Sequence, residues 1–353
     1  MFTILYDISK LKGLEECMKK IERTIEEHYE VMTKLSGPIA ISFDITNKCN
    51  LKCLHCYNDS GSGYTGELND SQVIEVGKQI AELHPISVCL CGGETLCREN
   101  ILELMDVMKD EVGAISMVSN GFLMTKEKAV ELKKRKLSQI QISIDGINKY
   151  QHDSFRQREG SFEKAVNAVR ILKDIGIKAI ATSFVPNKLN FRSIHEYIEM
   201  CMMLGVDVVR MMPFISSGRG RTVGESLILT KEEYFLFLRD MQDCISEFKE
   251  KINVEWGDPL DHMRRMPFNA KNGLKSYCME IKSNGDLTVT TYLPIVVGNC
   301  MLHSLKEYWD AGYNTIWNNK YVLNYLNKIM TIDDFTNFTP RPYEGEKILI
   351  DLM

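Results

Sequence analysis

The chain has 353 residues, of which 44% are hydrophobic and 26% are charged, and its formal net charge at pH 7 is −5. This length suits one large α/β domain with additions or two domains, and the lack of a long basic run argues against nucleic-acid binding. No apolar segment is long enough to span a membrane, and the N-terminus lacks the features of a secretory signal. Eleven cysteines without a signal peptide indicate a reducing compartment, so we predict a cytoplasmic protein.

The first predicted element is an amphipathic helix over residues 11–35. Apolar side chains recur there at steps of three and four residues, and lysines and glutamates fill the opposite side. A partner-binding helix and a helix packed on the main domain both fit this pattern, but three heptads are few for a coiled coil, which favours packing. Because Gly37 and Pro38 end the helix, residues 1–37 are predicted to be an N-terminal helical extension.

Strand and helix signals then alternate over residues 38–250. Strands are predicted at 38–46, 86–91, 114–119, 139–144, 177–185 and 206–212, and helices at 69–84, 98–109, from Thr125, at 161–175, 191–204 and 230–250. Six strand–helix units in series predict a parallel sheet of the α/β class. We expect this sheet to curl into a partial (β/α)6 TIM-like barrel.

A different pattern follows the barrel, and we predict a small C-terminal domain over residues 251–353. Residues 278–292 alternate on both sides of Asn284-Gly285, which predicts a β-hairpin. Residues 303–318 are predicted to be helical. The C-terminal domain is therefore expected to consist of a hairpin and a helix.

Three cysteines, Cys49, Cys53 and Cys56, directly follow the first predicted strand. Three soft thiolates on one short loop can hold three irons of a cubane iron–sulfur cluster, which leaves the fourth iron open to an outside ligand. The alternatives are a zinc site with His55 as fourth ligand and a disulfide. His55 would be crowded between two cysteines, and a reducing compartment disfavours disulfides. The spacing favours the iron–sulfur cluster.

Glycine and polar residues also follow the next three predicted strands. These residues are Gly92-Gly93-Glu94, Asn120-Gly121 and Asp145-Gly146. Binding groups of α/β barrels gather at the carboxyl ends of the strands. Because those ends meet at one edge of a parallel sheet, the sequence predicts one binding site formed together with the cysteine loop.

This combination of motifs resembles the radical S-adenosylmethionine (radical SAM) superfamily. The resemblance covers residues 38 to about 215 and rests on Cys-x3-Cys-x2-Cys after the first strand and Gly-Gly-Glu after the second. It implies a [4Fe-4S] cluster on Cys49, Cys53 and Cys56 whose open iron binds S-adenosyl-L-methionine (SAM). Reductive cleavage of SAM would give a 5′-deoxyadenosyl radical that abstracts hydrogen from the substrate, with a flavodoxin or ferredoxin-type protein as electron donor.

The resemblance also assigns SAM contacts. The matching positions are Tyr57, Gly92, Gly93, Glu94, Asn120, Ser143 and Arg156. The match places Glu94 on the methionine ammonium, Arg156 on the SAM carboxylate with Arg158 as a competitor, Tyr57 by the adenine and Asn120 on the ribose side. A charge-assisted contact such as that of Glu94 is stronger than a neutral one.

The stretch from Gln141 to Gly205 and the C-terminal motifs resemble the branch of this superfamily that carries a SPASM domain. That branch includes maturases of ribosomally made peptides and sulfatase-activating enzymes. A full SPASM domain uses seven cysteines for two auxiliary clusters, but this chain has only Cys278 and Cys300 after residue 250. We predict a degenerate SPASM-like domain and a single, SAM-binding cluster. One auxiliary cluster completed by other ligands is the alternative.

The resemblance therefore implies a peptide substrate that is crosslinked, epimerised or excised. A small-molecule substrate, such as a sugar or a tetrapyrrole, is the alternative, and a non-enzymatic iron–sulfur or zinc module is the third. An epimerisation needs a hydrogen donor, for which the candidate thiols are Cys91, Cys278 and Cys300. For the remaining cysteines after the loop we expect core packing, and these are Cys89, Cys97, Cys201 and Cys244.

Overall fold

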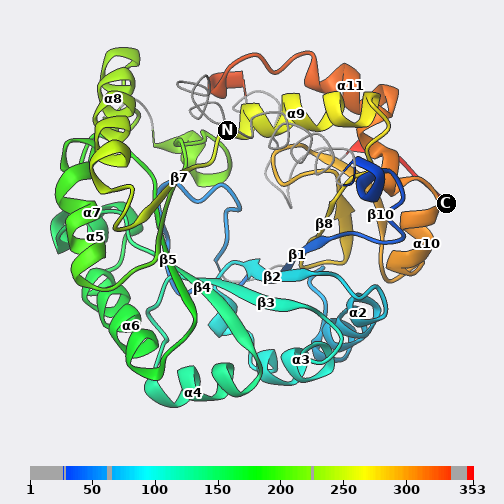
Figure 1. The fold of residues 1–353 in the computed structure, drawn as a ribbon, viewed down its shortest axis with the longest axis horizontal. Helices are drawn as coiled ribbons and strands as arrows, with labels where there is room; N and C mark the ends of the chain where they lie inside the picture. The colour runs from blue at the N-terminus through cyan, green and yellow to red at the C-terminus, as the bar shows by residue number, and fades with distance from the viewer. Residues whose placement is uncertain (1–26, 28, 62–65, 224–225, 335–347) are drawn as a thin grey trace, which may run out of the picture.

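The computed structural model describes residues 27, 29–61, 66–223, 226–334 and 348–353. In this part of the chain the strands form one sheet with the order β11-β10-β9-β8-β1-β2-β3-β4-β5-β6-β7. The sheet curves into an open arc, and the helices lie along its outer side (Figure 1). The predicted α/β partial barrel is confirmed, with the ends of the arc at β7 and β11 not paired with each other in the described residues.

The first seven strands of the chain pair in parallel, and they include all six predicted strands and one more. Its strands are β1 (Ala40–Thr46), β2 (Ser87–Gly92), β3 (Ala114–Ser119), β4 (Leu137–Ser143), β5 (Ala179–Phe184), β6 (Val208–Met211) and β7 (Asn253–Trp256). Strand β7 pairs in parallel with β6 and was not predicted. With only four residues, it is too short to give a clear alternation in the sequence.

The helices that cover the arc mostly begin at residues that the sequence marks. They are α2 (Asp70–Glu82), α3 (Ile101–Met108), α4 (Lys126–Lys134), α5 (Lys149–Arg156), α6 (Ser161–Ile175), α7 (Ile194–Met203) and α8 (Lys231–Phe248). The side chains of Asn69, Thr125 and Thr230 cap α2, α4 and α8, and Gly176 ends α6 with a φ of +74°. Side-chain caps satisfy backbone N–H groups that have no partner within the helix. Helix α5 was not predicted, because its eight residues are mostly polar.

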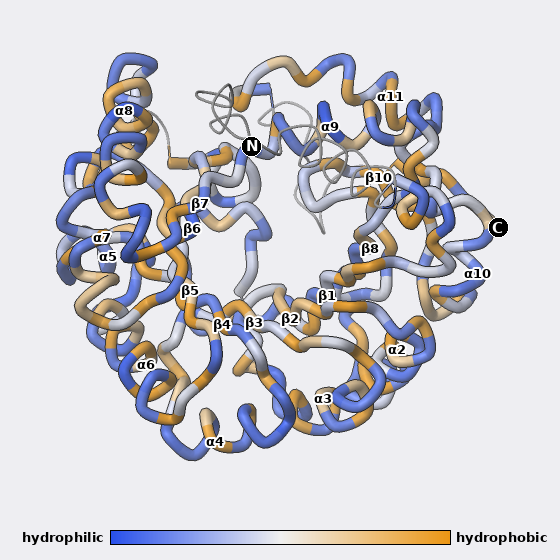
Figure 2. The backbone as a smooth tube through the Cα atoms, viewed as in Figure 1, coloured by the Kyte–Doolittle hydropathy of each residue, from blue (hydrophilic) through white to orange (hydrophobic). Residues whose placement is uncertain are grey.

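The core lies between the strands and the outer helices. Ile140 and Ile142 of β4 and Val169 and Leu172 of α6 are all fully buried in it. Figure 2 shows this arrangement as apolar strands inside a ring of helices with mixed hydropathy. Burial of one such side chain contributes roughly 1.5–3 kcal/mol to folding. The alternate residues of the strands point into the arc and include polar ones such as Gln141.

The C-terminal strands extend the same sheet beyond β1. They are β8 (Cys278–Ile281), β9 (Asp286–Thr288), β10 (Ile295–Asn299) and β11 (Ile348–Leu349). Strand β8 pairs in parallel with β1 and antiparallel with β9. The predicted hairpin is confirmed, with Gly285 at a φ of +84° in its turn. The C-terminal residues therefore contribute strands to the wall of the arc.

Three helices accompany these strands. They are α9 (Pro259–Lys271), α10 (Leu305–Asp310) and α11 (Lys320–Leu326). Helix α9 was not predicted, and the predicted helix over 303–318 is divided at Gly312, whose φ of +129° favours glycine. Most of the predicted N-terminal helix lies outside the described residues. None of the helices in the described ranges combines the length and the apolar character that a membrane span requires.

Candidate functional site

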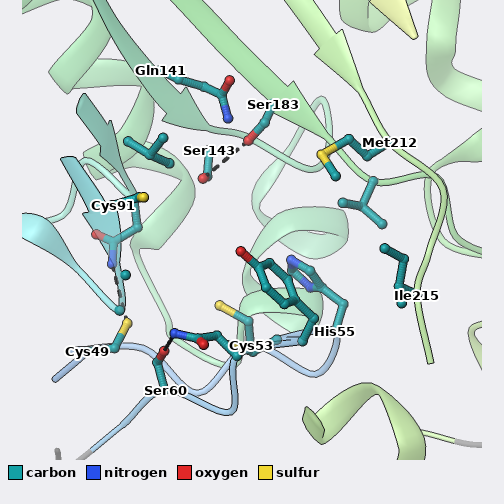
Figure 3. Close-up of a pocket in the computed structure, with 18 of the residues that line it drawn as sticks. Cys49, Cys53, His55, Ser60, Cys91, Gln141, Ser143, Ser183, Met212 and Ile215 are labelled. Atoms are coloured by element: carbon teal, nitrogen blue, oxygen red, sulfur yellow. Dashed lines mark hydrogen bonds between the residues drawn. The ribbon is translucent and has the colours of Figure 1, made fainter. Parts of the chain in front are cut away.

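A cavity of about 380 Å³ lies inside the arc, between the strand ends and the loop that follows β1. Figure 3 shows Cys91, Gln141, Ser143 and Ser183 on the strand side and Cys49, Cys53 and His55 on the loop side. Met212 and Ile215 close a third side. The three cysteines of the loop all line this cavity, together with Tyr57, Gly92, Gly93, Asn120, Ser143 and Arg156. The structure thus brings together every predicted cluster and SAM residue except Glu94.

The loop after β1 is fixed by its own polar residues. The Asn58 side-chain amide donates to Asn47 Oδ1 at 3.2 Å, and the Ser60 hydroxyl donates to the same oxygen at 2.8 Å. The backbone N–H of Cys49 donates to the Gly61 carbonyl at 2.7 Å. Asn47, Asn58 and Ser60 are nearly completely buried. These contacts hold the cysteines in one compact loop.

The thiols of this loop suit a cluster rather than packing. Burial raises the pKa of Cys49 to about 11 and that of Cys53 to about 12, so both hold their protons unless a cation joins them. Arg156 Nη1 lies 3.8 Å from Cys53 Sγ, and Asn120 Nδ2 lies 3.9 Å from Cys49 Sγ. Three sulfur donors on one cavity wall fit an iron–sulfur cluster with one open position. Within the described ranges, no group of three His, Cys, Asp or Glu side chains is arranged to hold a single metal ion.

The ring of His55 stacks on Phe155, with the centroids 4.1 Å apart. Burial, Arg156 and Arg219 hold the pKa of His55 well below its usual value, so the imidazole is neutral. Its Nδ1 is buried without a hydrogen-bond partner, and its Nε2 lies 3.8 Å from Asp145 Oδ2. His55 lines the cavity. From the sequence, His55 was predicted only as an alternative zinc ligand.

Gly92 and Gly93 allow the cysteine loop to pack on the end of β2. A Cβ at Gly92 would lie 2.3 Å from the Thr46 carbonyl oxygen, and one at Gly93 would lie 2.2 Å from that of Lys48. Gly92 also has a φ of +123°. Backbone atoms cannot give way as a flexible side chain can, so both positions require glycine. The same bare backbone forms part of the cavity wall.

Glu94 lies behind the cavity wall and is completely buried. Its Oε1 accepts hydrogen bonds from the Ser119 hydroxyl at 2.7 Å and from the Leu96 N–H at 3.1 Å, and its Oε2 accepts one from the Asn120 N–H at 2.7 Å. Burial raises the pKa of Glu94 despite these bonds. The carboxylate therefore ties the turn after β2 to the end of β3, and it retains further acceptor capacity.

Asp145, at the end of β4, connects the surrounding elements. Its carboxylate accepts two short contacts from Arg156, at 2.8 Å from Nε and 2.7 Å from Nη2, and a hydrogen bond from the Val185 N–H at 2.8 Å. The Asp145 N–H donates to His152 Nδ1, and the pKa of His152 falls to about 3, mainly through burial. The sequence predicted Asp145 at the binding edge of the sheet but gave it no specific role. Arg156, predicted to pair with SAM, is already held by this buried carboxylate.

The other predicted SAM contacts surround the cavity from separate elements. The Asn120 side-chain amide donates to Asn50 Oδ1 at 2.8 Å, so it faces the cysteine loop. The Ser183 hydroxyl lies 3.3 Å from the Ser143 hydroxyl, and both line the cavity (Figure 3). Tyr57 is 37% exposed and lines the cavity as well. Ser183 was missed, although it occupies the position on β5 that pairs with Ser143 on β4.

The candidate hydrogen-donor thiols occupy different environments. Cys91 lines the cavity with its Sγ 3.1 Å from the Ser42 hydroxyl, whereas Cys278 does not line it. Cys300 is 1% exposed and belongs to the hydrophobic core, so the structure does not bring it to the cavity. Cys89 was expected in the core, but it lines the cavity beside Cys91. Because strand residues two apart share a face, both thiols point into the arc.

Comparison with known proteins adds to this geometry. Residues 43–201 match the family model described as the radical SAM superfamily. The antilisterial bacteriocin subtilosin biosynthesis protein AlbA of Bacillus subtilis is 30% identical over 289 residues, which cover 81% of this chain and 60% of AlbA. The AdoMet-dependent heme synthase of Methanosarcina barkeri is 25% identical over 295 residues, which cover 78% of this chain and 83% of that protein. The chain thus spans only three fifths of the length of AlbA.

The fold also matches a solved structure. Streptococcus suis SuiB bound to its precursor peptide SuiA superposes with a TM-score of 0.66 and 17% sequence identity, over 94% of this chain and 80% of SuiB. At this level of identity the similarity concerns the fold. It extends beyond the barrel, since it includes most of the C-terminal residues of this chain.

Proposed function

We propose that the chain, whose residues 43–201 match the radical SAM superfamily, belongs to that family, cleaves SAM reductively and modifies a ribosomally made peptide. The reaction would be a crosslink, an epimerisation or an excision. The observation that carries the proposal is the cavity, because Cys49, Cys53 and Cys56 line it together with Ser143 and Arg156. Family membership implies SAM and an iron–sulfur cluster as cofactors, and we assign the cluster to these three thiols.

The cluster would be of the [4Fe-4S] type. Cys49, Cys53 and Cys56 would hold this cluster, which would supply the electron for reductive cleavage of SAM to a 5′-deoxyadenosyl radical that removes hydrogen from the substrate. The chain's own residues bind and orient. Asp145 holds the Arg156 guanidinium in one place through short contacts, and Arg156 adds positive charge 3.8 Å from Cys53 Sγ. That charge would favour the thiolate form that ligation requires.

The SAM-contacting residues would act from four strand ends at once. The glycines after β2 would leave backbone groups open to the methionine portion, and Ser143 would hold SAM from β4. Tyr57 would lie by the adenine, and Asn120, which lies over the cysteine loop, would contact the ribose side. Arg156 would meet the carboxylate from within its pair with Asp145. Glu94 would reach the ammonium only with acceptor sites left over from its three protein hydrogen bonds.

A peptide substrate is supported by the relatives. AlbA serves biosynthesis of a bacteriocin, and SuiB, whose fold this chain shares, binds a precursor peptide. A small molecule of the tetrapyrrole class is the second candidate, because the heme synthase of M. barkeri matches over most of its length. A flavodoxin or ferredoxin-type protein would donate the electron in either case. For an epimerisation, Cys91 is the proposed hydrogen donor, because it lines the cavity.

Anaerobic reconstitution with iron and sulfide, followed by SAM and dithionite, tests the proposal. The expected product is 5′-deoxyadenosine, and addition of precursor peptides encoded near the gene should give a mass change in one of them. Tetrapyrroles serve as the competing substrates in the same assay. A zinc-loaded protein that forms no 5′-deoxyadenosine would overturn the enzyme proposal, and a mass change in a tetrapyrrole alone would replace the peptide by the small molecule.

A further inference from the structure

One arginine from outside the cysteine loop binds that loop at several points. The segment after β6 turns at Ser217 into a short 3-10 helix, Gly218–Thr222. Arg219 in this turn directs its Nε to the Cys53 carbonyl at 3.0 Å and its Nη1 to the Ser60 carbonyl at 2.6 Å. Nη1 also contacts Asp59 Oδ1 at 2.8 Å. One guanidinium thus joins the two ends of the segment 53–60.

The backbone of the same turn adds to these contacts. The Arg219 N–H donates to the Cys56 carbonyl at 3.0 Å, so both Cys53 and Cys56 are held through their carbonyls. Gly218 lies so close that an added Cβ would be 2.5 Å from the carbonyl oxygens of both Cys56 and Tyr57, and its φ is +53°. The turn after β6 therefore packs directly against the cysteine loop, backbone to backbone.

The geometry of these contacts requires an arginine. A planar guanidinium presents several N–H donors in a fixed arrangement, whereas a lysine ammonium is a point charge on a flexible chain. Arg219 uses two of its nitrogens on three acceptors, which belong to Cys53, Asp59 and Ser60. Its side chain is 20% exposed, which limits screening by solvent. A lysine could keep the charge but could not join the Cys53 and Ser60 carbonyls.

We propose that Arg219 is a positioning residue that fixes Cys53 and Cys56 relative to the end of β6. The role in cluster binding rests on the proposed function, but the fixing of the loop does not. Ile215, four residues before Arg219, lines the cavity from the same segment. The turn after β6 therefore holds the cysteine loop and, through Ile215 and Arg219, also forms part of the cavity wall, so this part of the wall and the cysteine loop keep one relative position.

The first test uses the metal-free protein. Alkylation rates of individual cysteines, measured by mass spectrometry, should rise on the order of tenfold at Cys53 in Arg219→Gln, because several hydrogen bonds are lost from one local segment. Arg219→Lys should behave like the glutamine variant. The buried Cys201 and Cys244 report global unfolding and should stay slow. Arg239→Gln, at an exposed arginine on α8, is the matched control and should leave all rates unchanged.

Unchanged alkylation of Cys53 in both Arg219 variants would overturn the proposal, whether or not the protein binds iron. Equal acceleration at Cys201 and Cys244 would also overturn it, because Arg219 would then support the whole fold.

The reconstituted protein gives the second test. Since a nearby cation stabilises the reduced, more negative cluster, Arg219→Gln should shift its reduction potential to a more negative value, with Arg219→Lys in between. Failure to form any cluster in the unaltered chain would remove the proposed function but not the loop-fixing role.

Discussion

The cysteines after β1 and those of the C-terminal strands have opposite surroundings. Cys49, Cys53 and Cys56 lie on a loop that polar residues hold open toward a cavity. Cys300 packs in the hydrophobic core and is 1% exposed. Cys278 lies on a strand of the same sheet but outside the cavity lining. A thiol of this protein is therefore a ligand candidate where its loop leaves the sulfur facing the cavity.

The C-terminal strands contribute something else to the site. Lys282, just after β8, donates to Asp44 Oδ2 of the neighbouring strand β1 at 3.1 Å. Tyr292, which follows β9, lines the cavity. The C-terminal residues therefore supply one aromatic residue of the cavity lining and a buried ion pair with β1. The expectation of a single cluster stays a prediction, and the following experiments test whether the two regions differ as their surroundings indicate.

The largest effect is expected from the loop cysteines. Replacing Cys49, Cys53 and Cys56 together by alanine should abolish iron binding and SAM cleavage, because no other thiols of the described chain share that loop. The matched control is the double variant Cys278→Ala, Cys300→Ala, which should keep its iron and sulfide. Iron and sulfide analysis after anaerobic reconstitution measures both. Stoichiometric iron in the triple variant would establish an auxiliary cluster and remove the contrast between the regions.

The next effect concerns the buried pair beside the loop. Asp145→Asn should lower the free energy of unfolding by roughly 3 kcal/mol, because it leaves the Arg156 guanidinium buried without its counter-charge. Denaturant unfolding of the metal-free protein measures this. Asp110→Asn, which breaks an exposed pair with Lys136, should produce no measurable change. Equal stability of the two variants would mean that Asp145 does not organise the site.

A pH-dependent effect of at most similar size is expected at Glu280 in β8. Burial raises the pKa of Glu280 to about 7, with Lys282 opposing the rise and Asp44 adding to it. A raised carboxyl pKa favours the protonated folded state, so this group loses stability as the pH rises from about 4.5 to about 7. Glu280→Gln should remove that loss and gain up to ~3 kcal/mol relative to the unaltered chain across this window.

Unfolding free energies at pH 4.5, 6 and 8 measure this gain, and Glu75→Gln, at an exposed position on α2, is the control. Glu280 pairs in the sheet register with Ser42, which pairs with Cys89, so one row of side chains joins the two regions. A constant difference between Glu280→Gln and the unaltered chain at all three pH values would contradict an ionisable Glu280 in this row.

The smallest effect is expected at Cys300. Cys300→Ala removes one buried sulfur and should cost about 1 kcal/mol of stability through lost packing. Iron content and SAM cleavage should not change, because the side chain belongs to the core and not to the cavity. Loss of product with intact SAM cleavage would instead support Cys300 as the hydrogen donor. The peptide assay described above measures that outcome.

Most of the barrel and the three loop thiols could be predicted from the sequence. Short apolar runs located the first six strands, the period-3.6 pattern located helices between them, and capping residues such as Thr125 and Gly176 located helix ends. These signals are local, because a cap or an alternating strand depends on residues only a few positions apart. Helix α5, strand β7 and helix α9 were missed, because short or polar segments carry little periodicity.

The contacts that support the site could not be predicted from the sequence, because they depend on the tertiary structure. Asp145 contacts Arg156 and Val185, and Arg219 lies 159 positions from Ser60 in the sequence yet binds its carbonyl. Likewise, Cys91 and Cys300 are similar as sequence residues, but one faces the cavity and the other the core. Such distinctions depend on which strands pair and which loops meet. Pairing brings together residues far apart in the chain, and no local pattern encodes that contact.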